Sequence, residues 1–190
     1  MTRLRTLLVV AAAAAALSAC RSTTTYYVHP RADLGTIQKV GVMPFETMTA
    51  ERAPADKVQK IFITELLATG AFEVVEPGVV LKALKDEKVE SVASLTPADI
   101  VKLAKAMGAS GLFFGTVVDF GDARGGGTGP ASEITIQLRL VDGQSGATVW
   151  TASRTRNGAT VGARLFGFGG DSSSEVARDL LRDELATLLK

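Results

Sequence analysis

The sequence has no excess of charge of either sign and no apolar run long enough to cross a membrane. Its 190 residues hold 21 basic and 20 acidic side chains. This balance leaves no electrostatic footprint for nucleic acid, whose phosphates are bound by clustered lysine and arginine. The apolar run at residues 7–17 covers about 11 residues, whereas a transmembrane helix needs roughly 20. We therefore expect no nucleic-acid partner and no membrane-spanning helix.

Histidine and cysteine are equally scarce, with one of each in the chain. His29 lies in a polar segment, and Cys20 lies just after the N-terminal apolar run. Without a second histidine, a nucleophilic serine in the domain has no histidine to act as its base. We therefore expect no catalytic residues, no metal site and no cofactor.

The N-terminus has the order of features that marks a secretory signal. Arg3 and Arg5 precede the apolar run, no acidic residue comes before it, and small residues follow it. The segment Leu17, Ser18, Ala19, Cys20 resembles a lipobox, the cleavage site of bacterial lipoproteins. The resemblance implies that residues 1–19 are a signal peptide that is removed. It also implies that Cys20 receives a thioether-linked lipid and that the new N-terminus is acylated, with palmitate as the expected acyl group.

The expected lipid also bears on anchoring and on the compartment. A diacylglycerol and an N-acyl chain together satisfy the need for more than one signal in stable membrane attachment. The alternative is an ordinary signal peptide that ends near a cysteine by chance. Arg21 follows Cys20, in place of the aspartate that resembles an inner-membrane retention signal. We therefore expect a lipid anchor in the outer membrane, on its periplasmic face.

The remaining chain reads as a short tether and one domain. Residues 20–36 are polar and lack helical periodicity, so we interpret them as the lipidated cysteine and a flexible tether. Fully extended, that tether reaches roughly 60 Å, at about 3.3–3.6 Å per residue. Residues 37–190 are enough for one domain, which buries about 68–70% of the surface that its unfolded chain exposes.

Hydrophobic periodicity predicts a single three-layer α/β domain, in which helices cover a mixed β-sheet. Apolar or alternating runs predict strands at 39–45, 72–76, 111–120, 133–141 and 147–153. An apolar face predicts helices at 53–68, 78–88 and 97–107, and from 172 to the C-terminus. The expected helix caps are Thr96 and the pair Ser172 and Glu175, and the expected helix ends are Gly70 and Gly108.

Five segments stand in the order expected of one superfamily of bacterial envelope proteins. They are Val40–Phe45, Gly70–Glu76, Leu103–Ala109, Gly115–Val118 and Leu138–Asp142. The chain resembles the periplasmic domain shared by CsgG-type curli secretion lipoproteins, LpoB-type activators of penicillin-binding proteins and the TolB N-terminal domain. The resemblance covers nearly the whole mature domain and implies its fold. Members of the superfamily do different things, so it implies function less closely.

Three motifs resemble parts of a phosphate-binding loop, a serine nucleophile loop and a cation site, but the neighbouring sequence does not support these interpretations. Residues 125–129 are glycine-rich, but no Gly-Lys-Ser/Thr follows them, as a phosphate-binding loop would require. Residues 169–173 lack the Gly-x-Ser-x-Gly elbow of a serine nucleophile, so a capping role explains Ser172 better. The acidic residues near one hairpin read as solvated charges at strand ends rather than a cation site: Asp119, Asp122 and Glu133.

Residues 160–170 are the least ordinary stretch, apolar and rich in glycine. Its large side chains are Leu165, Phe166 and Phe168. One interpretation is a loop folded over the core through these side chains. The other is an exposed patch for a partner or membrane surface, because exposed apolar patches usually mark contact sites.

These observations favour a non-catalytic interaction or assembly module of the cell envelope. Its expected partners are the membrane, reached through the lipid, and a periplasmic or outer-membrane protein, or further copies of itself. One alternative is an oligomeric subunit of a CsgG-type secretion assembly, which needs two long hairpins that residues 121–132 and 154–170 provide poorly. The other is an LpoB-like regulator of peptidoglycan synthesis, whose reach the tether would limit.

Cys20→Ser should abolish lipid attachment and release the protein from the membrane, because the thioether forms on the cysteine sulfur. Palmitate labelling and membrane fractionation in high salt measure both effects, and Ser22→Ala, outside the lipobox, serves as the control. A Cys20→Ser protein that still sediments with the outer membrane would contradict the lipid anchor. Recovery of the unmodified chain in purified inner membrane would contradict the expected compartment.

Overall fold

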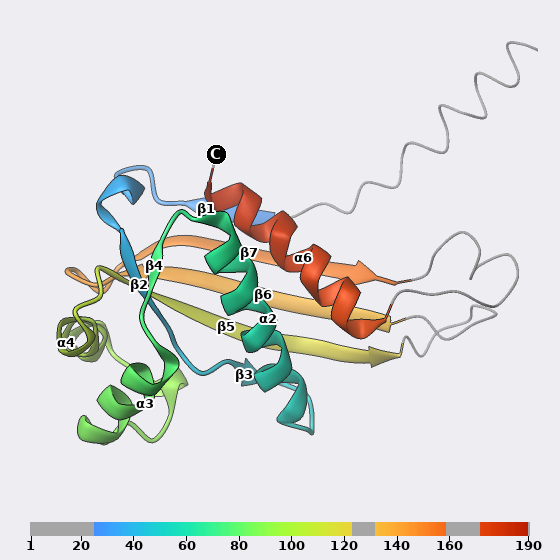
Figure 1. Ribbon diagram of the computed structural model, residues 1–190, viewed down its shortest axis with the longest axis horizontal. Coiled ribbons are helices and arrows are strands. Elements are labelled where there is room, and N and C mark those ends of the chain that lie inside the picture. The colour runs from blue at the N-terminus through green and yellow to red at the C-terminus, as the bar shows by residue number, and fades with distance from the viewer. Residues whose placement is uncertain (1–24, 123–131, 159–171, 190) are drawn as a thin grey trace, which may run out of the picture.

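The computed structural model describes residues 25–122, 132–158 and 172–189. At its centre is a 7-stranded sheet with the order β1-β7-β6-β5-β2-β4, in which β3 pairs with β5 (Figure 1). The strands are β1 (Thr25–Val28), β2 (Lys39–Val42), β3 (Glu46–Thr47), β4 (Glu73–Val74), β5 (Gly111–Asp122), β6 (Ser132–Asp142) and β7 (Thr148–Asn157).

Strand pairing divides the sheet into a parallel and an antiparallel part. β2 lies parallel to β4 and β5, whereas β5, β6, β7 and β1 pair antiparallel in that order. This mixed sheet confirms the α/β fold class. The Asp142 carboxylate closes the turn between β6 and β7: it accepts hydrogen bonds from the backbone N–H of Ser145 at 3.0 Å and from its hydroxyl at 2.5 Å. Gly146 completes the turn with φ 69°, a conformation that favours glycine.

Four α-helices lie in the described residues: α2 (Ala53–Thr69), α3 (Pro77–Asp86), α4 (Pro97–Met107) and α6 (Ser173–Leu188). Short 3-10 turns precede β2 and α4, namely η2 (Leu34–Thr36) and η3 (Val92–Ser94). Two helices begin with capping boxes, Thr96 with Asp99 and Ser172 with Glu175. The sequence predicts the second box, and for the first it predicts Thr96 as the cap. Two helices end at the predicted glycines in the left-handed conformation, Gly70 and Gly108.

Helices pack on both faces of the sheet, which confirms the three layers. α2 and α6 cover one face over an aromatic core, whose ring centroids lie 5.4 Å apart for Phe45 and Phe62, 5.2 Å for Phe62 and Phe113, and 6.3 Å for Phe113 and Trp150. α3 and α4 pack on the other face at one end of the sheet (Figure 1), where a second core contains Phe114. The rest of that second face, the open face, carries the exposed polar side chains of Gln137, Arg139 and Thr155.

Between β2 and β3, the Phe45 side chain packs closely against the backbone of β5. Phe45 is 1% exposed and lies flat against the backbone of β5 at Gly115. A Cβ atom at Gly115 would lie 2.4 Å from the nearest atom of the Phe45 ring, so only glycine fits there. The next two residues form β3, which pairs with β5. Glu46 lies opposite Thr116, and Thr47 lies opposite Val117.

Ion pairs connect α6 to its neighbours. Glu65 on α2 is 7% exposed at its side chain, and its carboxylate accepts hydrogen bonds from the Arg182 guanidinium, the shortest at 2.6 Å. Arg178 lies 3.4 Å from the same carboxylate. Two arginines therefore neutralise one buried carboxylate and hold α2 against α6. Trp150, buried in β7, donates from its indole N–H to the Thr187 hydroxyl at 3.1 Å and holds the other end of α6.

The N-terminal boundary differs from the expected one. β1 pairs with β7, and the His29 backbone N–H donates to the Val149 carbonyl at 2.8 Å. The tether expected over residues 20–36 is therefore wrong for residues 25–36, which belong to the fold rather than to a linker before residue 37. An edge strand that is exposed on both faces has no apolar alternation, so its sequence resembles a polar linker. No helix within the described ranges combines the length and apolar character that membrane crossing requires.

Glu184 on α6 differs from Glu65, the buried carboxylate that contacts two arginines. It is fully buried, and neither of its carboxylate oxygens has a hydrogen-bond partner among the described residues. Burial raises its pKa from 4.5 to about 9, although the positive charge of Arg154 opposes the shift. The folded protein therefore keeps a proton that the unfolded chain loses above about pH 4.5. The contribution of Glu184 to stability falls as the pH rises from about 4.5 to 9.

Glu184→Gln should raise the stability of the protein at neutral and alkaline pH, because the amide removes the cost of protonating a buried carboxyl. The expected gain grows from below about 1 kcal/mol at pH 5 to about 3 kcal/mol at pH 7, at roughly 1.4 kcal/mol per pKa unit. Thermal unfolding at pH 5 and pH 8 measures it, with the exposed Glu90→Gln as the control. A gain that is equal at both pH values would contradict a neutral Glu184.

Candidate functional site

Most residues that the sequence singles out lie outside the described part of the chain. These are the cleavage and lipidation residues Leu17, Ser18, Ala19 and Cys20, the contact residues Leu165, Phe166 and Phe168, and the glycine-rich residues 125–129. Lipidation and partner contact at these positions therefore stay predictions.

His29 is described, and it follows β1. Its Nδ1 accepts a hydrogen bond from the Arg31 backbone N–H at 3.2 Å, and its ring lies edge-on to Tyr27. It lines a hollow of about 270 Å³ together with Asp142 and Ser145. Because the Ser145 hydroxyl already donates to Asp142, these three side chains do not form a relay from serine through histidine to aspartate.

The acidic residues of the β5–β6 hairpin are also described in part. Asp119 pairs with Thr135 and Glu133 with Gly121, so the two acidic residues do not face each other directly across the strands. Within the described ranges, no group of three or more histidine, cysteine or acidic side chains could hold a metal ion.

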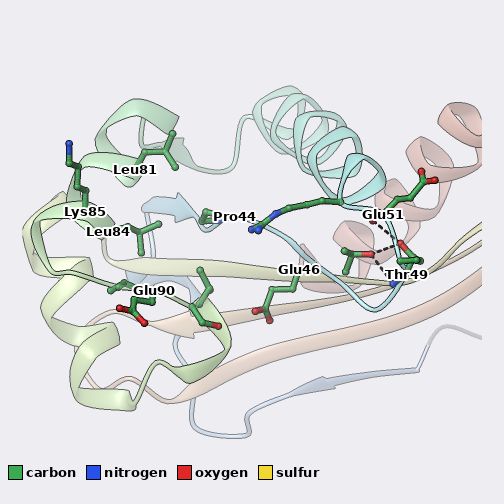
Figure 2. A pocket seen from close by; sticks show the side chains of 14 residues that line it. Pro44, Glu46, Thr49, Glu51, Leu81, Leu84, Lys85 and Glu90 are labelled. Carbon is green, nitrogen blue, oxygen red and sulfur yellow. Dashed lines mark hydrogen bonds between the residues drawn. The ribbon is translucent and has the colours of Figure 1, made fainter.

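A surface groove of about 640 Å³ lies between two segments of the described chain. One wall is the segment from Pro44 to Arg52, which runs through β3 to the start of α2, and the other runs from Leu81 on α3 to Val92 in η3 (Figure 2). Neither segment stands out in the sequence, and no pattern links the two, because they come together only when α3 packs on the sheet. Sequence analysis therefore missed this groove.

Hydrogen bonds between side chains and backbone shape the first wall. The hydroxyls of Thr47 and Thr49 lie 2.7 Å apart, and the Thr49 hydroxyl donates to the Glu51 carbonyl at 2.9 Å (Figure 2). On the second wall, the Val89 backbone N–H donates to the Leu84 carbonyl at 2.9 Å, after Lys88 has turned the chain with φ 54°. Both walls are therefore held by local contacts and do not need a ligand to form.

The groove combines an apolar floor with charges of both signs. Pro44, Leu84 and Val92 supply apolar surface. Figure 2 shows the carboxylates of Glu46 and Glu90 on the same side of the groove. Among the ion pairs of the described residues, none involves these two carboxylates or Arg52, so their charges are free to meet a partner.

A second hollow of about 270 Å³ continues the groove onto the open face and shares Pro44, Glu46 and Val92 with it. Strand register places Arg139 on β6 directly between Phe114 on β5 and Thr151 on β7. The Arg139 guanidinium lies 4.7 Å from the centre of the Phe114 ring, a cation–π contact that orients it.

This arrangement suits binding better than bond making. A well-formed hollow with apolar surface and a few oriented polar groups is the usual form of a recognition site. The described groove offers carboxylates, a stacked arginine and hydroxyls, and its threonines at positions 47 and 49 are engaged with each other. The fold and the groove thus give a three-layer α/β scaffold with a recess on its surface.

The chain belongs to the family described as curli production assembly/transport component CsgG, whose model matches residues 31–187. No curated protein matches its sequence.

Solved structures of two bacterial proteins have similar folds. The PelC dodecamer from Paraburkholderia phytofirmans is 21% identical, with a TM-score of 0.61 over 88% of this chain and 97% of that one. Lipoprotein GNA1162 from Neisseria meningitidis is 16% identical, with a TM-score of 0.57 over 80% and 98% of the two chains. Identities this low show a common fold only.

Proposed function

We propose that this protein is a lipoprotein of the bacterial outer membrane, attached through lipid on Cys20, with its domain in the periplasm. We propose further that it is a non-catalytic protein-interaction or assembly module of the cell envelope. The observation that carries the proposal is the family match over residues 31–187, because that family is described by assembly and transport rather than by a reaction. The lipobox-like segment before Cys20 supports the anchor, and the preformed groove supports protein contact.

Self-association within a secretion or transport assembly is the second candidate. The family description names assembly and transport, and the similar PelC structure is a dodecamer. In this alternative, the groove or the open face contacts another copy of the chain rather than a different protein. The two candidates differ in the mass of the species bound at the groove.

A photo-activated cross-linker at Leu81, 59% exposed on α3 at the groove, should yield a discrete adduct in intact envelopes. Leu67 on α2 is a matched control, because it is 55% exposed and does not line the groove. An adduct of twice the chain mass favours self-association, and another mass favours a different partner. Equal or absent adducts at both positions would contradict an interaction role for the groove.

The apolar segment with Leu165, Phe166 and Phe168 is proposed as a further contact. It connects Gly158, which follows β7, to Ser172, which caps α6. If Phe166 and Phe168 make contacts, replacing each with alanine should leave the melting temperature within a few degrees and weaken partner capture. If they are core residues, each change should cost about 3–5 kcal/mol. Thermal melting and sedimentation of both variants decide between these outcomes.

A further inference from the structure

β1 is an edge strand that exposes three large side chains in a row. It pairs with β7 on one side, and no strand of the described residues pairs with its other side. Tyr26, Tyr27 and Val28 are 49%, 46% and 37% exposed. None of the other exposed large apolar residues of the described chain adjoins another in the sequence: Met48, Leu67, Val79, Leu81, Val118 and Leu189. Among the described residues, β1 is therefore the one place where exposed large apolar side chains follow one another in the sequence.

The register gives this edge an apolar surface on both sides of the sheet. Tyr26 pairs with Ala152 and Val28 with Trp150, both buried beneath α6, so Tyr26 and Val28 lie on the α6 face. Tyr27 pairs with Thr151 and therefore lies on the open face. A surface that contacts the sheet edge-on would meet all three side chains, whereas a partner on one face would meet only part of them.

The length of the preceding chain limits how far β1 can lie from the lipid. Thr25 follows Cys20 by five residues, so the first residue of β1 lies within about 18 Å of the lipidated sulfur, at 3.3–3.6 Å per residue. The roughly 60 Å tether expected from the sequence would have left the domain free to turn. Because β1 begins at Thr25, the actual tether is much shorter and does not leave the domain free to turn. It keeps β1 close to the bilayer surface.

The charge and the side-chain types of this segment match a lipid surface. Between Cys20 and Asp33 the chain carries Arg21 and Arg31 and no acidic residue. Basic groups next to an anchor are attracted to anionic lipid headgroups. Tyrosine is enriched where membranes meet water, because its ring is apolar and its hydroxyl is polar.

We infer that the β1 edge, formed by Tyr26, Tyr27 and Val28, is a contact surface for the lipid headgroup layer. This inference rests on the proposed lipidation of Cys20. The unpaired backbone groups of β1 stay hydrated among the headgroups, and the two tyrosines fix which edge of the domain faces the membrane. The groove lies toward the other edge of the sheet, at β3 and α3, and so faces the periplasm.

The lipidated full chain provides the test, because lipid on Cys20 leaves an introduced cysteine as the only reactive thiol. A fluorescent probe is attached at Val28→Cys or, as a matched valine control on α3, at Val79→Cys, which is 46% exposed. The protein is reconstituted in vesicles of phosphatidylethanolamine and phosphatidylglycerol that contain lipids with a headgroup nitroxide. Quenching should be several-fold stronger at position 28 than at position 79, and should fall toward the control value when Tyr26→Ser and Tyr27→Ser are added.

Three outcomes overturn the inference. Equal quenching at the two positions means that the domain has no preferred side. Quenching that survives the tyrosine changes, with an unchanged circular dichroism spectrum, means that the tether alone keeps position 28 near the bilayer. Probe shielding that persists in detergent and grows with protein concentration means that a second copy covers β1. The mass of the N-terminal peptide separates all three from a failure of the proposed function, since an unlipidated Cys20 refutes the anchor itself.

Discussion

The contact between Phe45 and Gly115 is the constraint on which the groove side of the molecule depends. Phe45 occupies the space where any side chain at position 115 would stand, and its ring joins the aromatic core through Phe62. Since the chain is held there, β3 pairs with β5, and the segment up to Arg52 is brought opposite α3 as a wall of the groove. A bulkier residue at position 115 would displace Phe45 and lose core packing together with the groove wall.

Local signals made the helices predictable. Thr96, Ser172 and Gly108 act within their own helix, so the sequence around each contains the full physical reason for its role. The apolar periodicity of the helices and strands likewise predicted the three layers. β1 was missed because both of its faces are exposed and leave no period, and the groove was missed because its two walls meet only through packing. The predicted anchor and contact residues lie outside the described chain.

The two buried glutamates show that burial alone does not determine a carboxyl group's charge. Glu65 faces two arginines from α6, and it stays paired at the boundary between α2 and α6. Glu184 follows Arg182 by two residues on the same helix, but it points into the core without a hydrogen-bond partner among the described residues, and its pKa rises to about 9. α6 is thus held to α2 by a carboxylate that contacts two of its arginines, while it buries a second carboxyl group that is neutral.

The width of the sheet separates the two surfaces that we propose as contact sites. β1 and β2 are the first and fifth strands in the sheet order, about 19 Å apart at roughly 4.8 Å per strand. A lipid anchor that enters the fold at β1 therefore acts at one edge, while the groove beside β3 and α3 opens near the other. Between them, on the open face, lie Gln137 and the stacked Arg139, both exposed. If a membrane occupies the β1 edge, an approaching protein finds the groove and this polar face unobstructed, so anchoring and partner contact do not compete for the same residues.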